Sequence, residues 1–330
     1  MDLDILFLGT AGSTPTARRG LPATLVSRGG DRLLFDCGEG TQRQLLSSVG
    51  LVELEDVFVT HFHADHFLGL PGMLKSFALR GRERPLRVHG PPGLRRLFDA
   101  FRPVIGRVTF PLELLEVDAG TPLRRDGYSV TPFPVEHGVR AYGYALVEDE
   151  RPGRFDEQRA RELGVEPGPD FGRLHAGEPV TGRNGEVVPE QVVGEPRPGR
   201  KVVIAGDTAP AEMTRVAAHQ ASLLVHEATF GADAVERAAE TAHSTARAVA
   251  ELAAAAEVAL LALTHLSPRY AGPELRDEAR SVFDRTIVPR DYDRVEIPFP
   301  ERGEPVLIRA RDARPAADSG REGVRTSGGP

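Results

Sequence analysis

Cysteine and long apolar runs are both scarce in this sequence. Cys37 is the only cysteine in 330 residues, which excludes an internal disulfide framework and favours a reducing compartment. No segment approaches the roughly 18 consecutive apolar residues of a membrane span. The acidic residues near the N-terminus are also unlike the basic start of a signal peptide. We therefore expect a cytoplasmic protein with no membrane partner.

An excess of positive charge is missing as well. The chain has 41 Lys and Arg against 48 Asp and Glu, a formal net charge of −7. This balance argues against attraction of the whole protein to nucleic acid, but it does not exclude a local basic groove. The apolar content of 40% is enough for a sizeable core in one large domain or two ordinary ones.

Short β-rich runs and stretches with helical apolar spacing alternate along most of the chain, with a meander of strands at the start. This pattern predicts a layered α/β fold in which helices cover two packed sheets. The expected strands are 3–8, 23–28, 31–36, 57–60, 85–89, 129–133, 141–147, 201–205, 222–226, 259–264 and 305–309. The expected helices are 39–49, 67–80, 91–101, 211–219, 244–256 and 274–284.

Two segments depart from this pattern. Residues 148–200 are rich in Gly, Pro, Arg and Glu, and their only helix-like stretch is about 156–163. Such an insertion is either a functional arm or a disordered loop. Residues 311–330 cannot bury a core, and we expect them to form a disordered tail after a domain of residues 1–310.

The motif H-x-H-x-D-H at 61–66 carries the most specific chemical signal. It sets His61, His63, Asp65 and His66 directly after the β-type run 57–59. A loop between a strand and a helix can aim these side chains at one point. Imidazole nitrogens and carboxylate oxygens are ligands that suit zinc.

Three further candidate ligands each terminate an apolar strand. They are His137, Asp207 and His265. Taken singly, each could be a strand-end cap or a hydrogen-bonded polar residue of the core. Together with the motif at 61–66, they can complete the shells of two metal ions.

This set of residues resembles the metallo-β-lactamase superfamily, whose fold is a four-layer αββα sandwich with the metal site at one edge of the sheets. The resemblance implies two zinc ions per subunit, bridged by Asp207 and a water or hydroxide. Two zinc ions favour phosphodiester hydrolysis. The implied ligands are His61, His63 and His137 for one ion and Asp65, His66 and His265 for the other.

Further motifs over about residues 3–310 resemble the ribonuclease Z family, tRNA 3′ processing endonucleases. They are 8–10, 35–44, 226–230, 243–245 and the Gly- and Pro-rich 163–172. The resemblance implies that residues 148–200 form an inserted arm that binds precursor tRNA, and that the protein is a homodimer. Two alternative functions are considered. One is another hydrolase of the same fold (a phosphodiesterase, arylsulfatase, lactonase or thioesterase), and the other is a noncatalytic RNA-binding module.

The implied reaction is hydroxide attack on the phosphodiester after the discriminator nucleotide, which leaves a tRNA 3′-OH and a trailer 5′-phosphate. Asp65 would accept a proton, and His243, oriented by Glu227, would donate one to the leaving oxygen. A plain histidine at a helix N-terminus is the alternative for His243. Arg269, four residues past His265, is a candidate for binding a substrate phosphate.

The stretch from Lys75 to Arg107 holds nine basic residues against two acidic ones. It is either a track for RNA phosphates or a set of solvated helix faces. The sequence leaves this choice open, together with the choice between zinc and manganese, the treatment of CCA-bearing precursors and the range of other RNA substrates.

Overall fold

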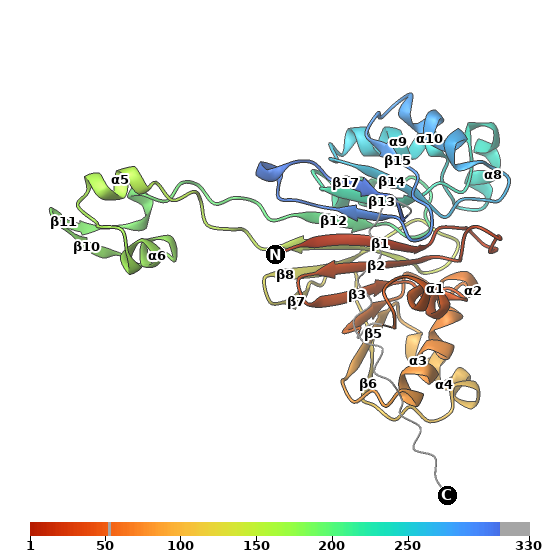
Figure 1. Cartoon of the computed structure of the whole chain (residues 1–330). Coiled ribbons are helices and arrows are strands. Elements are labelled where there is room, and N and C mark those ends of the chain that lie inside the picture. The colour runs from red at the N-terminus through yellow and green to blue at the C-terminus, as the bar shows by residue number, and fades with distance from the viewer. Residues whose placement is uncertain (52–53, 311–330) are drawn as a thin grey trace, which may run out of the picture.

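The computed structural model describes residues 1–51 and 54–310, so the predicted tail at 311–330 lies outside the described residues. Two sheets pack face to face and helices cover both outer faces (Figure 1). The predicted four-layer αββα sandwich is confirmed. The first sheet has the order β17 (Val306–Ile308), β16 (Arg294–Glu296), β1 (Leu3–Gly9), β2 (Ala23–Arg28), β3 (Asp31–Phe35), β4 (Asp56–Phe58), β5 (Leu86–Gly90) and β6 (Leu112–Glu116).

The second sheet combines an antiparallel half with a parallel half. Strands β7 to β9 and β12 pair in antiparallel fashion, whereas β12, β13, β14 and β15 run parallel. Its order is β15 (Thr286–Ile287), β14 (Leu261–Thr264), β13 (Leu223–Glu227), β12 (Lys201–Ile204), β9 (Tyr142–Glu148), β8 (Tyr128–Pro134) and β7 (Leu123–Arg125).

Three apolar clusters hold the four layers together. The central cluster lies between the sheets and contains Phe7, Phe35, Phe58 and Tyr144. The two outer clusters lie beneath the helices of each face, as the apolar stripes of amphipathic helices require. The helices are α1 (Thr41–Ser48), α2 (Ala64–Phe67), α3 (Gly69–Leu79) and α4 (Leu94–Ile105) on the first face and α7 (Glu212–Ala218), α8 (Val235–Glu240), α9 (Ala246–Ala255) and α10 (Gly272–Arg280) on the second. Short 3-10 turns are η2 (Ala232–Ala234) and η3 (Pro300–Arg302).

Residues 149–200 leave the body between β9 and β12 and fold into a small unit that projects from it (Figure 1). The unit has its own buried cluster, which includes Val165, Leu174 and Val180. The insertion is therefore folded. Its elements are α5 (Glu157–Glu162), α6 (Pro169–His175), β10 (Val180–Gly182), β11 (Gly185–Val187) and η1 (Pro189–Gln191).

Several short elements escaped prediction. The expectation of a single helix-like stretch in the insertion was wrong, because α6 and the β10–β11 hairpin form as well. Helix α6 has only seven residues and begins with Pro169, so it has too few turns for its apolar spacing to be recognised. Strands β6, β7, β15 and β16 and helix α8 were also missed, and each is six residues or shorter.

In the described part of the chain, none of the helices has both the length and the apolar character needed to cross a membrane.

Candidate metal centre

Four candidate ligands lie in the segment that follows β4. His61 is fully buried near the strand end. His63 is extended and precedes α2, whose single turn carries Asp65 and His66. In an extended segment, residues two apart point to the same side, so His61 and His63 share a side. The turn of α2 then brings Asp65 and His66 toward the same region.

The other three candidates follow strands of the second sheet. His137 follows β8, Asp207 follows β12, and His265 follows β14. Strands β8, β12 and β14 are not adjacent in the sheet, but they run in the same direction, so their carboxyl ends lie at the same edge. His265 has a φ of 55°, and Gly12 packs so closely on its ring that a Cβ there would lie 2.6 Å from Nδ1. Glycine at position 12 is therefore needed for this backbone path.

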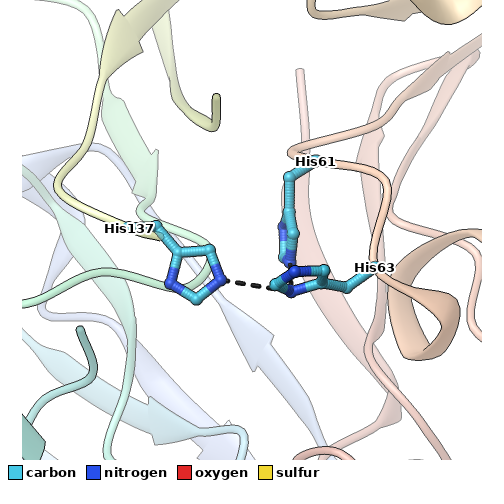
Figure 2. A group of neighbouring side chains, drawn as sticks. All are labelled: His61, His63 and His137. Atoms are coloured by element: carbon cyan, nitrogen blue, oxygen red, sulfur yellow. Dashed lines mark hydrogen bonds between the residues drawn. The ribbon is translucent and has the colours of Figure 1, made fainter. Parts of the chain in front are cut away.

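The first group contains His61, His63 and His137. Figure 2 shows the three rings converging, two from the first sheet and one from the second. His63 Nδ1 lies 3.0 Å from His61 Nε2 and 3.2 Å from His137 Nε2. Two nitrogens that bind one tetrahedral zinc ion at about 2.0–2.1 Å lie about 3.3 Å apart. The spacing of the three rings therefore fits one ion.

The second group contains Asp65, His66 and His265, whose ligand atoms also lie within 4.8 Å of one another. Asp207 lies between the two groups. Its Oδ2 is 3.3 Å from His66 Nε2, 3.2 Å from His265 Nε2 and 3.9 Å from His61 Nε2. The structure thus brings all seven candidate ligands together, with Asp207 between the two groups.

Two buried polar atoms in this centre support a bound cation. His66 Nε2 and Asp207 Oδ1 have no hydrogen-bond partner within the described ranges 1–51 and 54–310. Burial without a partner costs free energy for either atom, and far more for a carboxylate. A metal ion would bind both atoms, so the donor set fits divalent metal ions.

The charges of two candidate ligands, Asp207 and His61, match this donor set. Burial raises the pKa of Asp207, but the neighbouring His265 and His66 outweigh it and hold the pKa of Asp207 well below its usual value. Burial lowers the pKa of His61 well below its usual value, and the neighbouring His66 adds to this shift. Asp207 is therefore an anion and His61 a neutral ring, which are the protonation states that bind metals.

Asp36 orients one of the ligands, a role that the sequence did not indicate. Its Oδ2 lies 2.7 Å from His66 Nδ1, and it accepts hydrogen bonds from the backbone N–H and hydroxyl of Thr60. A hydrogen bond at Nδ1 fixes the tautomer of His66 and leaves Nε2 for a metal. The signals in the sequence are that Asp36 directly follows the apolar strand β3 and lies within the motif at 35–44.

Glu227 and His243 form a close pair beside the second group. Glu227 is the last residue of β13 and is almost fully buried. Its Oε1 lies 2.6 Å from His243 Nδ1 and accepts a hydrogen bond from the backbone N–H of Thr208. Burial lowers the pKa of His243, but the hydrogen bond and charge of Glu227 outweigh it, and the net pKa is raised. This pairing can present Nε2 of a protonated His243 to a substrate.

Thr229, which the sequence did not single out, connects this pair to a candidate metal ligand. Its hydroxyl donates to Glu227 Oε2 at 2.7 Å and lies 2.9 Å from His265 Nδ1. Glu227 therefore orients His243 directly and His265 through Thr229. His243 also lies near Asp207, 4.0 Å from its Oδ2.

Two other candidates are placed less favourably. Arg269 is exposed, and within the described residues no hydrogen bond or ion pair joins its guanidinium to the metal centre. In the basic stretch from Lys75 to Arg107, Arg82 is buried and donates to backbone carbonyls. Arg87 pairs with the buried Asp56. These two arginines support the fold, which leaves a smaller basic surface than the sequence indicated.

Comparison with known proteins agrees with this fold. A family profile described as the metallo-beta-lactamase superfamily matches residues 19–186. The metallo-beta-lactamase fold protein YhfI from Bacillus subtilis has a TM-score of 0.66 at 19% identity, covering 90% of this chain and 100% of that protein. The chain belongs to the metallo-β-lactamase superfamily.

Closer relatives define the family within it. A protein named Ribonuclease Z from Natronomonas pharaonis is 48% identical over 91% of this chain and 100% of its own length. Another protein named Ribonuclease Z, from Gemmatimonas aurantiaca, is 47% identical over 91% of this chain and 98% of its own length. The crystal structure of the short form of human tRNase Z has a TM-score of 0.64 at 25% identity, covering 89% of this chain and 99% of that one. Within the superfamily, the chain is a member of the ribonuclease Z family.

Proposed function

We propose that this chain is a zinc-dependent endoribonuclease that removes the 3′ trailer from precursor tRNA. The observation that carries the proposal is that the seven candidate metal ligands lie beside the hydrogen-bonded Glu227–His243 pair. The substrate follows from the relatives, which bear the name Ribonuclease Z at 47–48% identity over 91% of this chain.

Seven residues would hold the two metal ions. His61, His63 and His137 would bind one, and Asp65, His66 and His265 the other, with Asp207 between them. Two such ions lower the pKa of water and stabilise negative charge on a phosphoryl group. Asp36 would keep His66 in position for this binding.

The protein residues account for both proton transfers. Water attacks the phosphorus after the discriminator nucleotide, and Asp65, held by the backbone N–H of Ser13 at 3.0 Å, accepts the proton that the water loses. The bond from phosphorus to the 3′ oxygen breaks as His243 donates a proton to that oxygen. The tRNA keeps a 3′-OH and the trailer leaves with a 5′-phosphate. Arg269 would pair with a neighbouring phosphate.

The arm would bind the tRNA at a distance from the metal centre. Net charge does not supply this binding, because every arginine of residues 151–200 except Arg154 has an acidic partner within 4.0 Å. Binding of tRNA by the arm must therefore depend on the shape of the arm and on its exposed backbone.

We also propose a homodimer in which the arm of one subunit holds the tRNA that the other subunit cuts. The arm joins the body at the end of β9 and the start of β12, whereas Asp207 follows the opposite end of β12. Residues 201–207 span roughly 20 Å when extended, and the arm projects away from the body (Figure 1). Mixing an Asp207→Asn chain with a chain that lacks the arm should give more cleavage of precursor tRNA at low substrate concentration than either chain gives alone. A monomer by light scattering would contradict this part of the proposal.

One assay tests the main proposal. Purified protein is incubated with a 3′-extended precursor tRNA, either with zinc or manganese or after chelation and dialysis. We expect cleavage directly after the discriminator, loss of cleavage on chelation and its return with metal. A 2′-deoxy substitution at the scissile nucleotide should leave cleavage intact, since water is the nucleophile. No cleavage at that position with either metal would refute the proposal and favour another hydrolase of the same fold.

A further inference from the structure

A two-stranded stalk connects the arm to the body. Arg151 and Arg197 exchange backbone hydrogen bonds of 2.8 Å in both directions, and Gly194 N–H donates to Arg154 O at 2.9 Å. The apolar cluster of the arm is separate from the clusters of the body. A short isolated ladder is weakly stable and bends easily, so the stalk alone does not fix the direction of the arm.

A segment from the far end of the chain packs on this stalk. Phe299 lies beneath the guanidinium of Arg151, with Arg151 Cζ 3.6 Å from the ring centroid. Glu301 accepts hydrogen bonds from Arg151 Nη1 at 2.7 Å and Nη2 at 3.1 Å, and from Arg197 Nη1 at 3.0 Å. Both residues belong to the connection between β16 and β17, which includes η3 beside the stalk (Figure 1). We call Arg151, Arg197, Phe299 and Glu301 the clasp.

The body side of the clasp is rigid. Arg200 Cζ lies 4.1 Å from the Phe299 ring centroid, and the Arg200 side chain is only 2% exposed. Arg200 donates to both carboxylate oxygens of Glu148 and to the carbonyls of Ile297 and Met1. Its guanidinium is thus held by several charge-assisted and backbone hydrogen bonds. Phe299 is therefore in contact with a fixed arginine of the body and an arginine of the stalk.

The strength of the clasp depends on charge. Hydrogen bonds from Arg151, together with the charges of Arg151 and Arg197, lower the pKa of Glu301 to about 2, so it is a carboxylate at neutral pH. A guanidinium close to an aromatic face is attracted by the negative charge density of the ring. The bidentate pairing of Arg151 with Glu301 adds a fixed direction to this attraction.

We propose that Phe299 and Glu301 are positioning residues that set the direction of the arm, and thereby the affinity for precursor tRNA. The inference rests on the proposed function of the arm. A small rotation at the stalk moves the far end of the arm much farther, so RNA bound there would no longer reach the metal centre in the correct register. Neither residue takes part in the chemistry, and substrates that do not contact the arm should not depend on the clasp.

The first test compares two substrates in the full-length, metal-loaded enzyme. For Phe299→Leu and Glu301→Gln, we expect the KM for 3′-extended precursor tRNA to rise roughly tenfold, a difference of about 1.4 kcal/mol, with kcat nearly unchanged. Hydrolysis of bis(4-nitrophenyl) phosphate, which has no part that could reach the arm, should stay at the wild-type rate. Phe299→Tyr keeps an aromatic face and should restore the wild-type KM. The matched control is Glu251→Gln, which removes the exposed ion pair of Glu251 with Arg247 on α9.

A second test measures the direction of the arm without activity. Glu186→Cys on β11 and Ala254→Cys on α9 would place one thiol on the arm and one on the body for labelling, since both positions are exposed. Cys37 is fully buried and should not be labelled. We expect a broader distance distribution between the labels in Phe299→Leu and Glu301→Gln than in the parent or in Glu251→Gln.

The outcomes separate the two proposals. If the wild-type enzyme does not cut precursor tRNA, the proposed function is wrong, and the label distances still decide whether the clasp holds the arm. If the wild type cuts precursor tRNA but both variants keep its KM and its narrow distance distribution, the role of the clasp is refuted. An equal loss of activity on precursor tRNA and on bis(4-nitrophenyl) phosphate would also refute the role of the clasp, because that result indicates damage to the whole fold.

Discussion

Glu227 contacts His243 directly and influences when that histidine carries a proton. Because Glu227 raises the pKa of His243, the acid form persists to a higher pH, and activity should fall as pH rises through this pKa. In Glu227→Gln the carboxylate charge is gone, so the pKa of His243 should drop and the alkaline limb of the pH–rate profile should move to lower pH. We expect kcat to fall roughly 10²-fold at neutral pH. The profile is measured from pH 5 to 9.

The control for this prediction is again Glu251→Gln, which changes the same charge on an exposed face of α9. It should leave the profile unchanged. A Glu227→Gln enzyme whose alkaline limb stays in place, whatever its rate, would show that His243 is not the acid.

Asp207 makes a different kind of contribution, because it lies between both groups of ligands. Asp207→Asn removes the negative charge but keeps the shape, so at least one of the two ions should be lost on dialysis. Metal content is measured by mass spectrometry of the dialysed protein. The exposed Asp118→Asn should retain the full content. Retention of two ions by Asp207→Asn with unchanged affinity would contradict the bridging position.

At the level of single residues, the sequence reveals the candidate ligands better than the residues that orient them. His137, Asp207 and His265 could be identified because each ends an apolar run, and strand ends meet at one edge of a sheet. Asp36 and Thr229 could not be assigned, since their partners His66 and His265 lie 30 and 36 residues away. Such hydrogen bonds depend on how strands are ordered in the sheets, which one sequence does not reveal.

The arm is an element with its own core, so it should be removable. We predict that replacing residues 155–193 by a short Gly-Ser turn leaves the thermal midpoint of the body within a few degrees of wild type, because the arm cluster is separate from those of the body. The KM for precursor tRNA should rise at least tenfold, while hydrolysis of bis(4-nitrophenyl) phosphate should persist. Loss of both activities in a folded variant would argue against a role of the arm in RNA binding.

Length decided which elements the sequence revealed. Strands such as β1 and helices such as α3 and α9 repeat their apolar pattern often enough to be recognised. Strands of two or three residues, such as β15 and β16, are defined by pairing with neighbours and have no period of their own. In the arm, Gly and Pro gave the impression of a loop, yet they lie at the ends of short elements around a small apolar cluster.

On the scale of the whole molecule, Asp56 joins the two sheets. It lies on β4, fully buried, and accepts hydrogen bonds from Arg87 on β5 and from Arg125 on β7 of the other sheet. His89 Nε2 lies 2.7 Å from it. Asp56→Asn would leave Arg87 and Arg125 without their charge partner. Their side chains are 35% and 22% exposed, so water compensates part of the loss and the cost should be about 1–3 kcal/mol, less than for a fully buried pair. We expect a loss of this size in the free energy of unfolding, measured by urea denaturation at pH 7.

The same carboxylate should govern stability in acid. Burial raises the pKa of Asp56, but His89, Arg87 and Arg125 outweigh it and hold the pKa below its usual value. The stabilisation is therefore complete above the unfolded pKa of about 3.9 and is lost as pH falls below it, so the wild type should lose more stability than Asp56→Asn between pH 5 and 2. Asp149→Asn, which breaks the exposed Arg124–Asp149 pair, should change stability by less than about 1 kcal/mol. Equal effects of the two substitutions would mean that burial adds nothing to the link between the sheets.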